Sequence, residues 1–343
     1  MTIRYQVLGS PGRDNALLVR VDTGQSITRI LFDCGDGCVA ELGFGEIQAI
    51  DELFFSHLHM DHIGGFDSFF RCTFNRDAKP NRIWGPAQTS TILQHRFCGF
   101  WWNLHAGQPG TWQVCDILPD RVERSRFEIA EAFATRHADG NFAPVDGCVL
   151  ETPEYEIRAL PLKHNGPCLG YLLRERSSVN VRTERLAELG LKPGAWLKAL
   201  KGGTAETATD SSGTTLDLIA LRRELLVETP GDSIAYLTDF LLDDETCEFL
   251  ELQLRGCRTV VCEAQYRHED LELARRNSHT TTSQVAQMAA RAGIGELVLF
   301  HLSDRYDQST WLEMLDECRR QFPATNFPAS WQLGQSTDGV KDD

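Results

Sequence analysis

The segment Phe54–Gly65, with the sequence FFSHLHMDHIGG, is the most informative part of the chain. It begins as an apolar strand, in which alternation points the side chains of His57 and His59 to the same side. A turn into a helix can bring Asp61 and His62 to that side as well. Imidazole nitrogens and a carboxylate oxygen suit zinc, and the mixture also tolerates manganese or iron. A single histidine would more often be structural, but this cluster directly before Gly-Gly predicts a metal site.

Three further residues of ligand type follow apolar, strand-like segments elsewhere in the chain: His164, Asp239 and His301. Side chains at strand ends gather along one rim of a sheet, so these residues are candidates to complete the site. Together with the first cluster they make a set of seven, in which Asp239 is suited to bridge two ions. Two ions roughly 3.5 to 4 Å apart would polarise a phosphoryl or acyl centre and hold a bridging hydroxide at neutral pH.

A leaving oxygen also needs a proton, and His279 is the candidate donor. It lies in the stretch 277–282, NSHTTT, on a loop that precedes a predicted helix. Glu263, at the end of another apolar strand, is a candidate to orient it. The alternatives are that His279 is a capping or solvated residue and that Glu263 is structural.

The composition sets limits on the partners of the protein. The chain has 343 residues, of which 42% are hydrophobic, so one large domain or two modest ones would fit. The formal net charge of −15 argues against broad attraction to nucleic acid, which needs a surplus of Lys and Arg over at least one face. Any contact with RNA must therefore be local or be assisted by bound cations.

The chain is expected to be a cytoplasmic protein without a membrane span. No stretch approaches the roughly 18 consecutive apolar residues that a span needs, and the start has no basic segment followed by an apolar core. The eleven cysteines are scattered without C-x-x-C spacing, so neither a disulfide framework nor a zinc ribbon is indicated. Reduced and mostly buried cysteines are the expectation.

Sequence periodicity predicts layers of sheet and helix. The expected strands are 3–8, 16–21, 29–32, 52–55, 82–84, 155–162, 169–174, 233–237, 259–263 and 296–300. The expected helices are 68–74, 88–97, 282–292 and 311–322, with Gly293 as the left-handed stop of the third. This order implies a mixed α/β fold in which helices cover two stacked sheets.

One segment differs in composition from the rest of a single domain that spans residues 1–343. Between Ser177 and Thr215 the chain is rich in Gly, Lys, Thr and Ser. We interpret residues 177–215 as a protruding, arm-like insertion, and the alternative is a plain solvated loop.

The motifs, taken in chain order, resemble those of the ribonuclease Z family, the tRNA 3′-processing endonucleases of the metallo-β-lactamase superfamily. The segments that carry the resemblance are Ser56 to His62, Pro161 to His164 with Gly170-Tyr171, the strand end at Asp239, Glu263-Ala264, Ser278 to Thr281, and His301 to Tyr306. The likeness spans nearly the whole chain, which makes it more specific than the H-x-H-x-D-H signature alone.

The resemblance implies an αββα metallo-β-lactamase sandwich with two zinc ions per chain. The implied ligands are His57, His59 and His164 for one ion, Asp61, His62 and His301 for the other, and Asp239 for both. Asp61 would also assist as general base, and His279 would match the proton donor of the family.

The resemblance also implies a partner. In this family a protruding arm rich in Gly and Pro grips the elbow of precursor tRNA, usually across a homodimer. The segments 189–196 and 200–203 look similar to that arm. Its candidate contact residues are Lys192, Pro193, Gly194, Lys198 and Lys201.

Departures from the family pattern keep other hypotheses open. The first loop, residues 9–15, is short, Cys38 stands where a Thr is common, and Met60 and Phe240 replace smaller residues beside the ligands. These changes favour a second hypothesis, a hydrolase of small phosphodiesters such as cyclic nucleotides, with the aromatic residues 97–102 stacking on a base. The alternatives are harmless drift and ordinary core packing. A third hypothesis, a non-catalytic binding module, is disfavoured by the complete set of seven ligand-type residues.

Overall fold

The protein is described by a computed structural model, in which residues 2–333 are placed. The chain folds into two compact units. We call Glu175–Gly231 the inserted unit, and the segments on either side of it together form the main unit.

Two sheets form the centre of the main unit. In the first sheet the strands lie in chain order, with β3 to β6 parallel and the flanking strands antiparallel. Its strands are β1 Thr2–Leu8, β2 Ala16–Asp22, β3 Ile27–Phe32, β4 Glu52–Phe54, β5 Asn81–Pro86, β6 Thr111–Ile117, β7 Val122–Glu128 and β8 His137–Phe142. The second sheet has the order β19-β18-β17-β16-β11-β10-β9. Its strands are β9 Cys148–Glu151, β10 Tyr155–His164, β11 Gly166–Glu175, β16 Ser233–Leu237, β17 Thr259–Glu263, β18 Glu296–Phe300 and β19 Thr325–Asn326.

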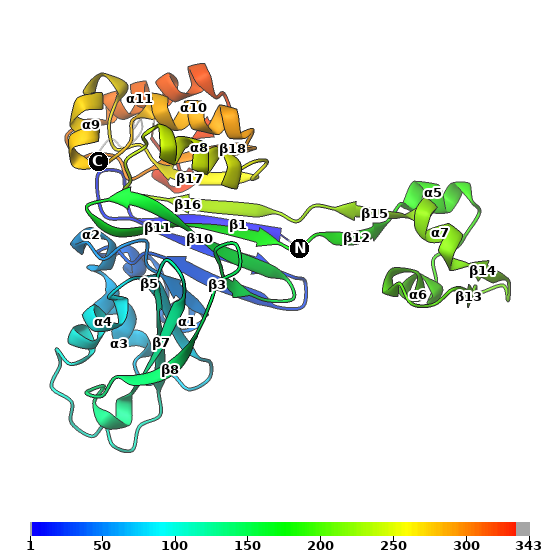
Figure 1. Ribbon diagram of the computed structural model, residues 1–343, viewed down its shortest axis with the longest axis horizontal. Helices are drawn as coiled ribbons and strands as arrows, with labels where there is room; N and C mark the ends of the chain where they lie inside the picture. Colours follow the sequence, from blue (N-terminus) through cyan, green and yellow to red (C-terminus); the bar gives the residue numbers. More distant parts are fainter. Residues whose placement is uncertain (1, 334–343) are drawn as a thin grey trace, which may run out of the picture. The chain divides into compact units, whose positions relative to one another are not determined.

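Helices cover the outer face of each sheet (Figure 1). The α-helices of the main unit are α1 Phe44–Gln48, α2 Met60–Ile63, α3 Phe66–Thr73, α4 Thr89–Phe97, α8 Asp244–Gln253, α9 Leu271–Asn277, α10 Thr282–Ala292 and α11 Gln308–Gln321. Short 3₁₀ helices are η1 Cys38–Glu41, η2 Ile129–Glu131, η3 His268–Asp270 and η4 Ala329–Trp331. None of the helices in the described part of the chain is long and apolar enough to cross a membrane.

The alternation of side chains along the strands produces three core layers. On β2, Leu17 and Val19 pack between the two sheets, whereas Leu18 packs outward against the helical layer of the first sheet. On β16, Tyr236 faces the space between the sheets and Leu237 faces the helices of the second sheet. Strands covered on both faces need apolar residues at every position, which explains the unbroken apolar runs. The expected αββα sandwich is confirmed.

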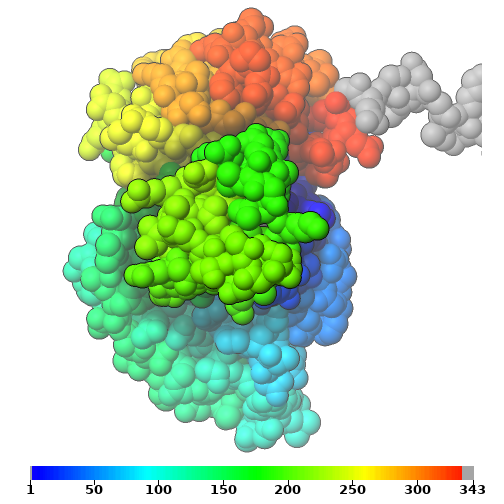
Figure 2. Space-filling view, turned by 90° about the vertical axis from the view of Figure 1, so that its right-hand side faces the viewer, coloured from blue at the N-terminus to red at the C-terminus, as the bar shows by residue number. Residues whose placement is uncertain are grey.

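The inserted unit has its own fold and its own core. Its elements are β12 Ser178–Val181, α5 Thr183–Glu188, α6 Trp196–Gly202, β13 Thr207–Thr209, β14 Thr215–Asp217, α7 Leu218–Leu225 and β15 Leu226–Thr229. The side chains of Trp196, Leu200 and Leu218 are buried together at its centre. Figure 2 shows the unit as a close-packed mass, coloured green to yellow-green. The prediction of a plain solvated loop is therefore wrong, and the segment is longer than the expected 177–215 because α7 and β15 complete it.

Most long elements were predicted to within a few residues, but one side of the first sheet and the edge strand β9 of the second were not. The strands 233–237, 259–263 and 296–300 and the helix 282–292 have the expected bounds, and Gly293 has the left-handed φ of 62°. The strands β6 to β9 were missed. Their sequences, such as VERSRFE in β7, mix charged residues on the outer positions with buried ones and so resemble loop sequence.

Glu52, on β4 of the first sheet, is a buried acidic residue. Its carboxylate accepts a hydrogen bond from the indole Nε1 of Trp84 at 2.8 Å and forms an ion pair with Arg82. Burial raises the pKa of Glu52 to about 7, although the charge of Arg82 and the hydrogen bond from Trp84 oppose the rise.

The substitution Glu52→Gln should flatten the dependence of the free energy of unfolding on pH. A carboxyl group with a raised folded-state pKa stabilises the fold below its ordinary pKa of 4.5, and this contribution is lost as pH rises through about 7. Gln is neutral at every pH and lacks this dependence. Urea unfolding over that range measures the slope. Glu123→Gln, at a surface carboxylate paired with Arg121, is the control, and an unchanged slope in Glu52→Gln would contradict the prediction.

Candidate metal centre

Four segments that are distant in sequence end at one rim of the sandwich and carry the predicted ligands. His57 and His59 follow β4, and Asp61 and His62 lie on the first turn of α2. The other three, His164, Asp239 and His301, stand at or just after the ends of β10, β16 and β18. The strands β16, β17 and β18 are parallel, so their carboxyl ends lie along the same edge.

The backbone turns sharply at two of these strand ends. Asp239 and His301 both have a φ of 51°, in the left-handed region that non-glycine residues rarely adopt. Such a conformation costs about 1–3 kcal/mol at each residue and persists only where the surroundings fix it. The turns direct both side chains over the rim, toward the residues that follow β4.

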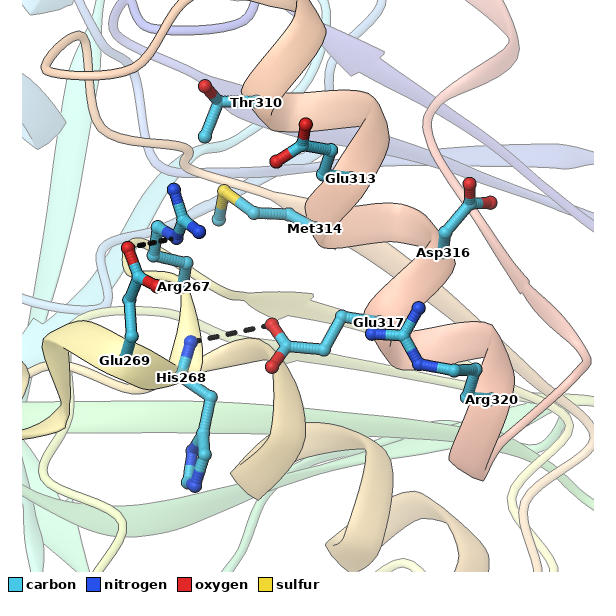
Figure 3. A pocket seen from close by; sticks show the side chains of 9 residues that line it. All are labelled: Arg267, His268, Glu269, Thr310, Glu313, Met314, Asp316, Glu317 and Arg320. Atoms are coloured by element: carbon cyan, nitrogen blue, oxygen red, sulfur yellow. Dashed lines mark hydrogen bonds and ion pairs between the residues drawn. The ribbon is translucent and has the colours of Figure 1, made fainter.

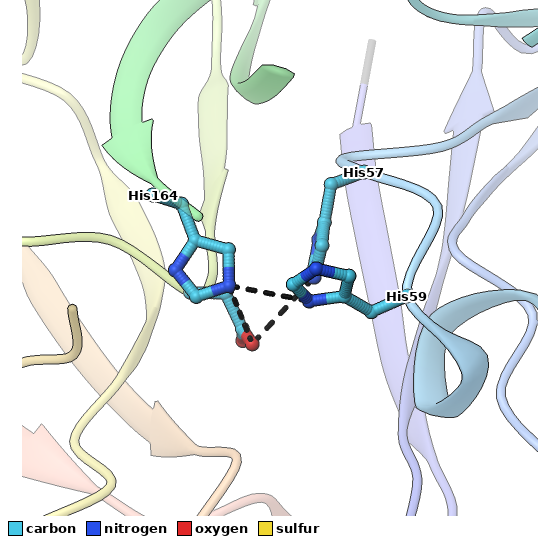
Figure 4. A group of neighbouring side chains, drawn as sticks. His57, His59 and His164 are labelled. Carbon is cyan, nitrogen blue, oxygen red and sulfur yellow. Dashed lines mark hydrogen bonds and ion pairs between the residues drawn. The ribbon is translucent and has the colours of Figure 1, made fainter. Parts of the chain in front are cut away.

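The first group of candidate ligands comprises His57, His59, His164 and Asp239. One nitrogen or oxygen atom from each lies within 4.8 Å of the others. The Nε2 atom of His164 is 3.3 Å from Nδ1 of His59, and the Nε2 atom of His57 is 3.6 Å from Oδ2 of Asp239. Figure 4 shows the three rings directed toward one another.

The second group comprises Asp61, His62, His301 and, again, Asp239. The Nε2 atom of His62 is 3.3 Å from Oδ2 of Asp61 and 3.4 Å from Oδ1 of Asp239. Asp239 therefore presents Oδ2 to the first group and Oδ1 to the second. A carboxylate placed in this way is suited to bridge two cations.

The donor atoms fit a metal ion rather than a network of protein hydrogen bonds. The Nε2 atoms of His57 and His62 are buried and have no hydrogen-bond partner among residues 2–333. Burial lowers the pKa of His57 to about 2, so its ring is neutral, which is the form that binds metals. Burial opposes the charged form of Asp61 too, but the neighbouring rings of His301 and His62 hold the pKa of this carboxyl below its usual range. Neutral imidazoles and ionised carboxylates are together a donor set for zinc and similar ions.

Asp33 supports the site and was missed by the sequence analysis. It is buried just after β3, and its carboxylate accepts hydrogen bonds from the amide and hydroxyl of Ser56, at 2.7 and 2.6 Å. The same carboxylate accepts a hydrogen bond from the hydroxyl of Tyr236 at 2.8 Å and contacts Nδ1 of His62 at 2.8 Å. With Nδ1 of His62 donating to Asp33, Nε2 is left with its lone pair toward the cluster. An acid directly after an apolar strand was the only available signal.

The predicted proton donor and its partner also lie at this rim. Nδ1 of His279 is 2.9 Å from Oε2 of Glu263, and Nε2 of His279 is 3.9 Å from Oδ2 of Asp239. Oε1 of Glu263 accepts the amide of Phe240 at 2.9 Å, which fixes the carboxylate. Burial disfavours the charged ring, but the charge and hydrogen bond of Glu263 raise the pKa of His279 to about 9. His279 is therefore protonated at neutral pH and directed at the cluster.

The residues that departed from the expected family pattern have different surroundings. Phe240 is fully buried among the helices of the second sheet and does not line the cleft beside the first group, which has a volume of about 210 Å³. Met60 is 82% exposed. Phe240 therefore does not narrow this cleft.

The aromatic residues 97–102 do not form a stacking platform in this cleft. Phe97 is buried, and Trp102 packs against Phe70 and Phe133 in the outer core of the first sheet. Trp101 is 93% exposed, but it does not line the cleft. Ordinary core packing, the alternative interpretation, accounts for Phe97 and Trp102.

The candidate tRNA contacts lie in the inserted unit, not at the metal cluster. Lys192, Pro193, Gly194, Lys198 and Lys201 are all exposed there. Trp196, between them in the sequence, is buried and donates its Nε1 hydrogen to the carbonyl of Lys192 at 3.1 Å.

Comparisons with known sequences give two matches of different extent. The chain is 50% identical over 329 residues to a ribonuclease Z from Deinococcus radiodurans, covering 96% of this chain and 98% of that protein. A family model described as anti-Pycsar protein Apyc1 matches residues 13–142.

Solved structures share the fold at low sequence identity. The metallo-β-lactamase fold protein YhfI from Bacillus subtilis has a TM-score of 0.56 at 14% identity, covering 95% of this chain and 96% of that one. The short form of human tRNase Z has a TM-score of 0.50 at 15% identity, covering 89% and 94%. The expected metallo-β-lactamase fold is confirmed.

Asp33→Asn should weaken the affinity for zinc or manganese by about 10- to 100-fold. The amide cannot accept from Ser56, Tyr236 and His62 at once, so the ring of His62 loses its fixed orientation. Competition with a coloured chelator measures the affinity, and circular dichroism checks folding. Asp36→Asn, at an exposed acid three residues further on, is the matched control. Equal affinity in the two variants would show that Asp33 does not orient the site.

Proposed function

Because the chain belongs to the ribonuclease Z family and is therefore a metal-dependent endoribonuclease, we propose that it removes the 3′ extension of precursor tRNA. The observation that carries the proposal is the carboxylate of Asp239, which faces two separate groups of ligand-type residues. The proposed ligands of two zinc ions are His57, His59 and His164 for the first, Asp61, His62 and His301 for the second, and Asp239 for both. Manganese and iron suit the same donor atoms.

Two divalent ions held side by side act as Lewis acids on a phosphoryl oxygen and lower the pKa of a bound water. The carboxylate of Asp61, ionised and 44% exposed, is placed to accept a proton from the attacking water as general base. The protonated ring of His279 is placed to donate the proton on Nε2 to the leaving oxygen. Glu263 holds the ring by its hydrogen bond to Nδ1, so we assign it a positioning role.

The inserted unit is part of the proposal, as the element that binds the elbow of the tRNA. Its exposed lysines Lys192, Lys198 and Lys201 give it cationic groups, whereas the chain as a whole carries a net charge of −15. A homodimer and a cytoplasmic location also belong to the proposal, the homodimer because the resemblance implies that the arm grips tRNA across two protomers.

A second candidate function is the hydrolysis of small phosphodiesters such as cyclic nucleotides. The cluster from His57 to His62 does not by itself select between the two candidates, and it lies within residues 13–142, which match the family model described as anti-Pycsar protein Apyc1. Phe240 is buried and Trp102 packs against Phe133 in the core, so two of the residues that were expected to shape a small-molecule pocket are used elsewhere.

The zinc- or manganese-loaded protein should cut a 3′-extended precursor tRNA next to the discriminator nucleotide. Parallel reactions with bis(p-nitrophenyl) phosphate and with a cyclic nucleotide separate the two candidate functions, and gel analysis of the tRNA ends locates the cut. His59→Ala should abolish turnover, whereas His95→Ala, outside the cluster, should retain it. Turnover of the cyclic nucleotide without cleavage of tRNA would refute the processing role.

His279→Ala should lower kcat for precursor tRNA by a factor of about 100 to 10,000, the usual contribution of a general acid. The metal content should stay the same, because the seven proposed ligands are intact. Single-turnover kinetics and metal analysis give the two quantities. His268→Ala, whose ring contacts Thr281 instead of the cluster, is the control. An unchanged kcat in His279→Ala would assign proton transfer to another group.

A further inference from the structure

An apolar cavity adjoins the metal cleft and extends away from it. We call it the edge groove; its volume is about 730 Å³, and its walls include Leu118, Val149 and Leu160. It shares Pro86 and Pro167 with the cleft that contains His57, His59 and His164. A chain that leaves the metal cleft on this side therefore enters the edge groove.

A second cavity, of about 340 Å³, continues the edge groove at Val149. Arg82 and Arg124 line it, and we call it the arginine cavity. The Nε atoms of both arginines are buried and have no hydrogen-bond partner among residues 2–333. A buried N–H group without an acceptor is unfavourable, and more so when it is charged, so the arrangement favours an acceptor supplied by a ligand.

The arginine cavity is lined by two guanidinium groups and by one carboxylate, that of Glu151. Arg82 forms an ion pair with Glu52 through its terminal nitrogen, which leaves its Nε unused. Arg124 stands on β7, and Phe142 beside it provides an aromatic wall. Guanidinium groups next to aromatic and apolar surface are the usual means of holding a phosphate and its base.

Another polar cavity, of about 350 Å³, also contains an arginine, but that arginine is paired with a carboxylate. It lies between η3 and α11 (Figure 3). Its Arg267 pairs with Glu269 at 2.8 Å, and Glu317 accepts the amide of His268 at 3.4 Å. Within residues 2–333, none of its lining residues has a buried polar atom without a partner.

We propose that the edge groove and the arginine cavity bind the single-stranded 3′ extension of the RNA substrate. This rests on the proposed function. Bases lie against the apolar wall at Leu118 and Val149, and a backbone phosphate accepts from Arg82 and Arg124. Cavities of a few hundred Å³ accept single nucleotides, whereas a paired RNA stem is too wide to enter them. The edge groove is thus a site for the part of the substrate that is removed.

The test compares precursor tRNAs that carry a short or a long 3′ extension. Arg124→Ala should raise KM for the long extension by roughly tenfold, and the slope of log KM against log salt should fall by about 0.7, as expected for one lost phosphate contact on a single strand. Leu118→Glu should raise the same KM by placing a carboxylate in the groove. Turnover of the short extension and of bis(p-nitrophenyl) phosphate should be unchanged. Arg121→Ala, at a surface arginine paired with Asp120 and Glu123, is the control.

Three results would overturn the proposal. The first is a KM that does not depend on the length of the extension while the wild type cuts the tRNA. The second is equal loss for both substrates in Arg124→Ala, which would indicate a structural role. The third is a change from dimer to monomer in Leu118→Glu, which would show that a second copy covers the groove.

A failure of the proposed function would be recognised separately. If the wild type does not cut precursor tRNA at all, fluorescence anisotropy of a labelled single-stranded RNA still tests the groove. Wild type should bind the oligonucleotide more tightly than Arg124→Ala does, and equal affinities would reject the groove as an RNA site.

Discussion

The buried carboxylate of Asp239 is the constraint on which the site depends. The side chain is almost inaccessible to solvent, and a buried carboxylate without compensation costs several kcal/mol. Burial alone would raise its pKa, but His301 and His62 hold the pKa of this carboxyl well below its usual range. The imidazoles of two groups therefore surround one charge. Any fold that keeps Asp239 ionised in this position must bring several distant strand ends to one rim.

Hydrogen bonds between the two sheets of the sandwich hold the strand ends at this rim in place. Asp33 follows β3 of the first sheet and accepts the hydroxyl of Tyr236 from β16 of the second. The hydroxyl of Tyr171, from β11, donates to the carbonyl of Phe55 at 2.7 Å, beside the start of the ligand cluster. These buried polar contacts fix the distance between the sheets at the level of the site. The core and the metal centre thus share a support, which explains how strained turns at Asp239 and His301 are maintained.

The two units of the chain differ in the residues that they contain. The main unit contains all the groups proposed to act on the phosphodiester, and it is an acidic unit in an acidic chain. The inserted unit contains the exposed lysines and a separate core around Trp196, so its fold does not depend on the metal centre. Because charge is distributed this way, the overall field of the protein does not attract RNA, and the RNA contacts that we propose are local ones, at groups such as Lys198 and Arg124.

The sequence by itself determined the elements whose physical signal is local. Apolar runs and caps predicted the buried strands from Ser233 onward and the helix that Gly293 ends, and the dense spacing of His57 to His62 indicated a metal site. The strands β6 to β9 were not predicted from the sequence. Polar residues in strands such as β7 and β8 occupy partly exposed positions, and which side chains are buried is decided only when the sheet forms. The role of Asp33 and the core of the inserted unit were decided by tertiary structure alone. The physical reason is that these features depend on contacts between residues far apart in the chain, which no local pattern of residues specifies.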